Sequence, residues 1–148
     1  MQKINKKIEY VNGKNLKACI VVSRWNNEIT DELLMSALET LKNCKVNDKN
    51  IKIVTVAGAM EIPFALQKMA QPKKYDFLVA LGCVIKGETP HFDYVCKMAQ
   101  EGVLKVSLEN NIPIGFGVLT VNNLSQAQKR IHVGGEAVLA ALELSLLK

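Results

Sequence analysis

The sequence lacks the long hydrophobic run of a membrane protein, because no apolar stretch approaches the roughly 20 residues that span a bilayer. Residues 1–7 also lack the apolar stretch of a secretory signal peptide. Disorder is excluded as well, since hydrophobic residues make up 49% of the 148 residues, enough to bury a sizeable core. We therefore expect a single soluble, cytoplasmic domain over residues 16–148, preceded by a basic tail over residues 1–15.

Basic residues outnumber acidic ones by only five, and the excess is concentrated at the start of the chain. Residues 1–17 carry a net charge of +4, from five lysines and one glutamate, so the rest of the chain carries only +1. A nucleic-acid surface needs a basic stripe on the folded body, usually with base-reading side chains between the charges. We therefore expect no nucleic-acid partner and, from the absence of an apolar span, no membrane partner.

No Cys-x-x-Cys pair occurs among the four cysteines, which are Cys19, Cys44, Cys83 and Cys96. Cys19 and Cys83 fall within apolar, strand-like runs, which favours reduced and buried thiols. The trio Cys83, His91 and Cys96 matches no zinc-ligand spacing and has no fourth partner. We therefore expect no metal site.

Apolar runs typical of strands alternate with stretches of helical periodicity along the chain. The predicted strands are residues 16–22, 51–56, 77–85 and 112–121. The predicted helices are residues 30–41, with Thr30 as the capping residue, then 61–70, 91–109, 124–131 and 136–147. The inward side chains expected on the third helix are Val95, Met98, Ala99, Val103 and Val106. This alternation predicts the α/β fold class, as a three-layer α/β/α sandwich with a four-stranded, mainly parallel sheet of flavodoxin-like topology.

Ligands of such sheets bind beyond the carboxyl ends of the strands, so the loops that follow the strands are the candidate site. The first loop holds Trp25, the only tryptophan, which either packs against the fold or stacks on a planar ligand. In the second loop, Gly58 and Ala59 permit close approach of a ligand to the backbone. Glu61 is either a carboxylate favoured by a helix start or an acceptor for ligand hydroxyl groups.

The third loop combines an anion-binding turn with a titratable side chain. Thr89 precedes Pro90 at a helix start, where free N–H groups form a natural phosphate or carboxylate site. His91 is either a surface or capping residue or a carrier of protons near neutral pH. Arg130, after the fourth strand, is a candidate anion clamp. A dinucleotide fingerprint is absent, since the only Gly-x-Gly, around Phe116, lies within a strand.

Four segments, in one register from about residue 16 to residue 130, resemble the lumazine synthase family. They are Ser-Arg-Trp-Asn at 23–26, Gly-Ala-Met-Glu-Ile-Pro at 58–63, Leu-Gly-Cys-Val-Ile-Lys-Gly-Glu-Thr-Pro-His-Phe-Asp-Tyr-Val-Cys at 81–96, and Phe-Gly-Val-Leu-Thr at 116–120. The third segment alone is highly specific.

The resemblance implies a transferase that condenses 5-amino-6-(D-ribitylamino)uracil with 3,4-dihydroxy-2-butanone 4-phosphate. The product is 6,7-dimethyl-8-ribityllumazine, and the reaction is the penultimate step of riboflavin biosynthesis. The resemblance implies no metal and no organic cofactor. It also implies a homo-oligomer, either a pentamer or an assembly of pentamers, with riboflavin synthase as a candidate partner.

The resemblance also implies a role for each matching site residue. Those matched to the pyrimidinedione and its ribityl chain are Trp25, Ala59, Met60, Glu61, Cys83, Val84, Ile85 and Phe116, the last supplied by the neighbouring subunit. Those matched to the phosphate are Glu88, Thr89 and Arg130, and His91 matches the proton-transfer residue.

After Arg130 the chain departs from the family pattern. The family continues with a longer loop and an Asn-Lys-Gly, whereas here residues 131–136 lead directly to the last predicted helix. The family lysine has no counterpart, the nearest basic side chains being Lys129 and His132. We expect residues 134 and 135, both glycines, to make a tight turn into that helix. A non-catalytic flavin or lumazine binder, an archaeal-type riboflavin synthase and a flavodoxin-like electron carrier are the alternative functions.

Overall fold

A computed structural model describes residues 11–148 of the chain. Along the chain its elements are β1 (Ala18–Ser23), α1 (Asn27–Asn43), η1 (Asp48–Asn50), β2 (Ile51–Val56), η2 (Ala59–Glu61), α2 (Ile62–Ala70), β3 (Phe77–Ile85), α3 (His91–Asn110), β4 (Ile114–Val121), α4 (Leu124–Gln128) and α5 (Val133–Ser145). Within the described residues, no helix is both long enough and apolar enough to cross a membrane.

The four strands form one sheet in the order β2-β1-β3-β4, and each neighbouring pair is parallel. Seven of the nine residues of β3 are buried, because β3 lies between β1 and β4 inside the sheet. This topology confirms the predicted fold class, including the flavodoxin-like strand order.

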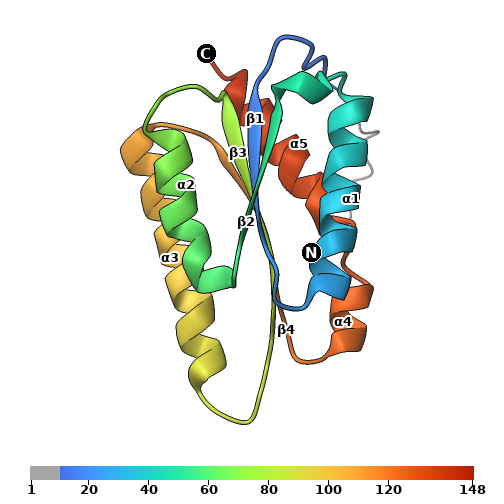
Figure 1. Cartoon of the computed structure of the whole chain (residues 1–148), viewed down its shortest axis with the longest axis vertical. Helices are drawn as coiled ribbons and strands as arrows, with labels where there is room; N and C mark the ends of the chain where they lie inside the picture. The colour runs from blue at the N-terminus through green and yellow to red at the C-terminus, as the bar shows by residue number, and fades with distance from the viewer. Residues whose placement is uncertain (1–10) are drawn as a thin grey trace.

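Helices cover both faces of the sheet (Figure 1). On one face, Leu33 and Leu41 of α1 pack with Val138 and Leu142 of α5 against the strands. On the other face, α2 and α3 bury a second cluster that includes Leu66. In Figure 1 the strands β1, β2 and β3 begin at the top of the view, whereas α1 and α3 begin at the bottom. The carboxyl ends of the strands and the starts of these helices therefore meet at one end of the molecule.

The first helix begins three residues earlier than predicted. Asn26, in the left-handed conformation with φ of 60°, precedes α1, so Thr30 lies inside the first turn and is buried. The prediction that Thr30 caps the helix was wrong, because asparagine adopts this backbone conformation more readily than most residues and can turn the chain directly after β1.

Two further predictions about helices were also wrong. Gly134 and Gly135 lie within α5 rather than in a turn before it, and neither has a positive φ. Both are buried, and a Cβ at Gly134 would lie 2.9 Å from the carbonyl carbon of Leu33. The glycines therefore permit close packing of α5 on α1. On α3, Met98 is 48% exposed rather than inward, whereas Ala99, which follows it, is buried.

Most of the predicted basic tail, residues 1–10, lies outside the described residues. Of the remainder, Gly13 is buried, and its N–H donates to the carbonyl oxygen of Cys44 at 2.6 Å. Val11 packs against the core cluster between the sheet and α1.

Candidate active site

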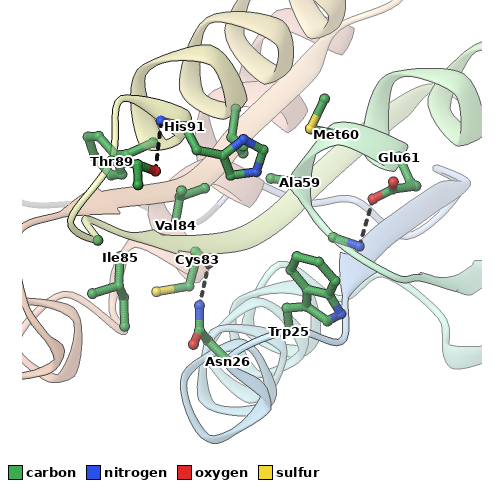
Figure 2. Close-up of a pocket in the computed structure, with 14 residues that line it drawn as sticks. Trp25, Asn26, Ala59, Met60, Glu61, Cys83, Val84, Ile85, Thr89 and His91 are labelled. Carbon is green, nitrogen blue, oxygen red and sulfur yellow. Dashed lines mark hydrogen bonds between the residues drawn. The ribbon is translucent and has the colours of Figure 1, made fainter.

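A pocket of about 440 Å³ lies at the carboxyl ends of the strands, within the usual size range of small-molecule sites. It is formed by three loops that are far apart in the sequence and by the first turns of α3 (Figure 2). Its lining residues are Trp25, Asn26, Gly58, Ala59, Met60, Glu61, Cys83, Val84, Ile85, Gly87, Thr89, His91, Phe92 and Val95.

The turn between β1 and α1 presents Trp25 to the pocket. The indole is 69% exposed, so it is not a core side chain and offers a ring face to a ligand. Its backbone N–H donates to the carbonyl oxygen of Ala57 at 3.0 Å, which ties this turn to the end of β2. Next to it, the side-chain amide of Asn26 donates to the carbonyl oxygen of Cys83 at 2.9 Å (Figure 2). These two bonds fix the stacking surface relative to the neighbouring strands.

The loop after β2 positions the carboxylate of Glu61. The backbone N–H of Gly58 donates to Glu61 Oε2 at 2.9 Å, which leaves the other oxygen free to accept from a ligand. A Cβ at Gly58 would lie 3.1 Å from Glu61 Oε2 and 3.5 Å from the indole of Trp25. The absence of a side chain at this position therefore lets the carboxylate and the indole share one wall of the pocket.

The end of β3 contributes Cys83, Val84 and Ile85 to the floor of the pocket. Burial raises the pKa of the Cys83 thiol from 9.0 to about 11, so the sulfur is protonated at neutral pH. A protonated thiol is a poor nucleophile. This strand end therefore provides apolar surface and backbone groups rather than a reactive sulfur.

The start of α3 brings Thr89 and His91 to the opposite wall. The N–H of His91 donates to Thr89 Oγ1 at 3.4 Å, and the imidazole is turned toward the centre of the pocket (Figure 2). Because α3 is 20 residues long and begins at His91, the positive end of its helix dipole lies beside Thr89. The geometry suits a phosphate or carboxylate next to a group that can transfer protons.

Three predicted site residues do not line this pocket. Phe116 lies on β4 between Ile114 and Val118 and is 42% exposed. Arg130 is exposed and donates from Nη1 to the carbonyl oxygen of Gln126 at 2.8 Å. Glu88 is exposed in the loop before α3. The other nine predicted site residues all line the pocket.

Sequence reasoning assigned no site role to Asn26 or Val95, although both line the pocket. The position of Asn26 directly after Trp25, at a strand end, was the available signal, because asparagine tolerates the backbone conformation that such a turn needs. Among residues 11–148 no three or more His, Cys, Asp or Glu side chains are grouped to hold a metal ion.

The chain matches a known protein family. The family model described as 6,7-dimethyl-8-ribityllumazine synthase matches residues 15–148, which is nearly the whole chain and every element described above.

Proposed function

The chain belongs to the 6,7-dimethyl-8-ribityllumazine synthase family, and we propose that the pocket at the strand ends is its active site. The chain is a transferase of riboflavin biosynthesis, and its substrates are small molecules. It condenses 5-amino-6-(D-ribitylamino)uracil with 3,4-dihydroxy-2-butanone 4-phosphate to 6,7-dimethyl-8-ribityllumazine, with release of phosphate and water. The observation that carries our proposal is the convergence of Trp25, Glu61, Thr89 and His91 on one pocket.

The pyrimidinedione binds against the indole of Trp25. A large exposed aromatic face beside strand-end backbone groups suits a flat, polar heterocycle, which needs stacking on its faces and hydrogen bonds at its edge. The backbone of residues 83–85 supplies the edge contacts. The ribityl chain extends along Ala59 and Met60, and its hydroxyl groups donate to the free oxygen of Glu61.

His91 moves protons between the successive steps. The ring amine attacks the ketone and forms an imine with loss of water. Phosphate is then eliminated together with a carbon-bound proton, and the enol that remains becomes a new ketone. The second amine attacks this ketone and closes the ring with loss of a second water. Each step adds or removes a proton at nitrogen, oxygen or carbon, and a histidine side chain can serve as acid in one step and base in the next. Holding both reactants in the pocket supplies a further large acceleration through proximity and orientation.

The phosphate of the butanone binds at the start of α3. Thr89 is its ligand on this chain, and the positive end of the α3 dipole favours its negative charge. Arg130 adds a fixed positive charge that stabilises the phosphate as it leaves, and Glu88, which the resemblance matches to the same site, lies in the loop before α3.

We propose that each active site is shared between neighbouring copies. Phe116 and Arg130 match site residues of the family but lie outside the pocket of their own chain. This position supports the proposal that they contribute to the pocket of a neighbouring copy. Tyr94 and Met98 on α3 are 70% and 48% exposed, and an adjoining subunit would cover such apolar surface. We propose a pentamer or an assembly of pentamers in the cytoplasm, with riboflavin synthase as a partner that consumes the product.

The site is tested by following lumazine absorbance and phosphate release with both substrates present, against a protein-free control. We expect Glu61→Gln to raise the KM for the pyrimidine substrate roughly tenfold, because a charge-assisted hydrogen bond is lost. Glu109→Gln, which removes the same charge from the far end of α3, is the matched control. Equal KM values for the two variants would reject the pocket as the ribityl site.

Sharing of the site is tested by mixing two inactive variants, His91→Ala and Arg130→Gln, under conditions that let subunits exchange. If His91 and Arg130 of one site come from neighbouring copies, an equal mixture regains about a quarter of wild-type activity, because random neighbours complete one site in four. An additive mixture with no regained activity would place both residues in the same chain's site.

A further inference from the structure

A second pocket, of about 190 Å³, lies at the end of the sheet opposite to the active site. Its lining includes Lys17 before β1, Lys49 in η1, Lys52 in β2, and Lys74 with Tyr75 just before β3. In Figure 1 this is the upper end, where the three strands begin. We call this site the lysine pocket.

Strand order explains why these lysines converge. The strand β1 lies between β2 and β3, and Ala18 is in register with both Ile51 and Phe77. The segments that enter the three strands therefore run side by side. Lys52 is in register with Cys19 and its side chain lies on the same face of the sheet. The Lys74 ammonium lies 5.8 Å from the centre of the Tyr75 ring, and both residues line the pocket.

In the described part of the chain, the four lysines of the lysine pocket have no ion-pair partner within it. No aspartate or glutamate lines it, and none of the ion pairs among residues 11–148 involves its four lysines. The nearby carboxylate of Asp76 accepts from the backbone N–H of Lys17 at 2.7 Å, and Asp48 is exposed in η1. Four lysines that line one concavity bring like charges near one another, and a bound anion would relieve their repulsion.

We propose that the lysine pocket binds a small anion that carries two or more phosphate groups. Lysine ammonium groups are strong point-charge ligands for phosphate, and four of them from three segments suit a multivalent anion better than a single phosphate. The pocket is smaller than the roughly 300–1,000 Å³ of sites for drug-sized ligands, so it suits a compact anion. Its position at the opposite end of the sheet separates this site from that of the phosphate-bearing substrate.

The test is calorimetric titration of the folded protein with inorganic pyrophosphate. We expect the double variant Lys52→Gln/Lys74→Gln to raise the Kd at least about tenfold, because two charge-assisted contacts are lost. The matched control is Lys97→Gln/Lys105→Gln, which removes the same charge from α3, where both side chains are 72% exposed. The control should keep the wild-type Kd, and Lys52→Arg/Lys74→Arg should also retain binding.

The variant Thr89→Val distinguishes pyrophosphate binding at the lysine pocket from binding at the active site. It should leave pyrophosphate binding at the lysine pocket intact. The proposal is overturned if the lysine variants and their control have the same Kd, or if Thr89→Val abolishes all pyrophosphate binding. It is also overturned if pyrophosphate does not bind while a single-stranded oligonucleotide binds with an affinity that grows with its length, because that behaviour indicates a nucleic-acid surface.

Discussion

Replacing Gly134 with alanine probes the packing of α5 against α1. The added Cβ would lie 2.9 Å from the carbonyl carbon of Leu33 and 3.2 Å from its Cα. These atoms belong to the backbone of α1, so no rotamer change can move them away. Carbon atoms are in favourable contact at about 3.5–4.0 Å, and the two helices must therefore separate by on the order of 1 Å.

The expected loss of stability follows from two opposing effects. Overpacking of this kind costs about 1–3 kcal/mol or more, and a clash with backbone belongs at the upper end of that range. Alanine is favoured over glycine inside a helix by about 1 kcal/mol, which offsets part of the loss. We therefore expect Gly134→Ala to lower the free energy of unfolding by about 2 kcal/mol. In a domain of this size that corresponds to a decrease in Tm of roughly 4–8 °C.

The assay is thermal unfolding followed by circular dichroism at one fixed protein concentration, since association shifts the apparent Tm. Gly87→Ala is the control, because a Cβ at Gly87 meets no atom within 4 Å and its φ is not positive. That variant should melt no lower than wild type. If Gly134→Ala melts at or above the wild-type temperature, the inferred close approach of α5 and α1 is wrong.

Three further predictions concern the site and the buried thiols. His91→Ala should lower kcat by about 100-fold or more while changing the Kd of the pyrimidine substrate by less than about threefold, as measured by steady-state kinetics and calorimetry; equal weakening of both would remove His91 from proton transfer. Asn26→Ala should destabilise the protein by about 1–2 kcal/mol in urea unfolding, and Asn26→Gly should destabilise it by less. Both variants lose the hydrogen bond to Cys83, but only alanine also strains the left-handed backbone at this position. Equal losses of stability would contradict the argument from backbone conformation. Burial raises the pKa of Cys19 and Cys83 from 9.0 to about 11, so the folded state keeps protons that the unfolded state releases. Stability should therefore fall as pH rises from 9 to 11, by up to about 3 kcal/mol for each thiol. A Cys19→Ala/Cys83→Ala variant with an equally steep alkaline decline in urea unfolding would contradict the last prediction.

Strand positions could be predicted well because their signal is local. Residues 51–56 and 77–85 were predicted as strands with the same bounds that β2 and β3 have, since each is a continuous apolar, β-branched run between polar segments. Helix starts were harder to predict. Thr30 resembles a capping residue as strongly as any other in its segment, and only the tertiary bond from Asn26 to Cys83 identifies the true start of α1.

The role of Gly134 and Gly135 could not be read from the sequence for a related reason. A pair of glycines before an apolar periodic stretch is typical of a turn. The actual reason for the glycines is close packing against α1, which is distant in the sequence: the Gly135 N–H donates to Ser36 Oγ, 99 residues away, at 3.0 Å. Long-range approach of two backbones leaves no periodic pattern in either segment. Sequence analysis likewise named nine of the residues that line the pocket, but it also assigned Arg130 to the site, and Arg130 does not line the pocket of its own chain.

The fluorescence of Trp25 tests the central claim most directly, because it is the only tryptophan in the 148 residues and lines the pocket. We expect the pyrimidine substrate to change the tryptophan emission in a saturable way, in wild type and in His91→Ala alike. The midpoint should match the Kd from calorimetry, and Trp25→Ala should weaken binding roughly tenfold through loss of stacking. If wild-type protein forms lumazine while its tryptophan emission is unchanged at saturating substrate, the pyrimidinedione binds elsewhere and the strand-end pocket is not the active site.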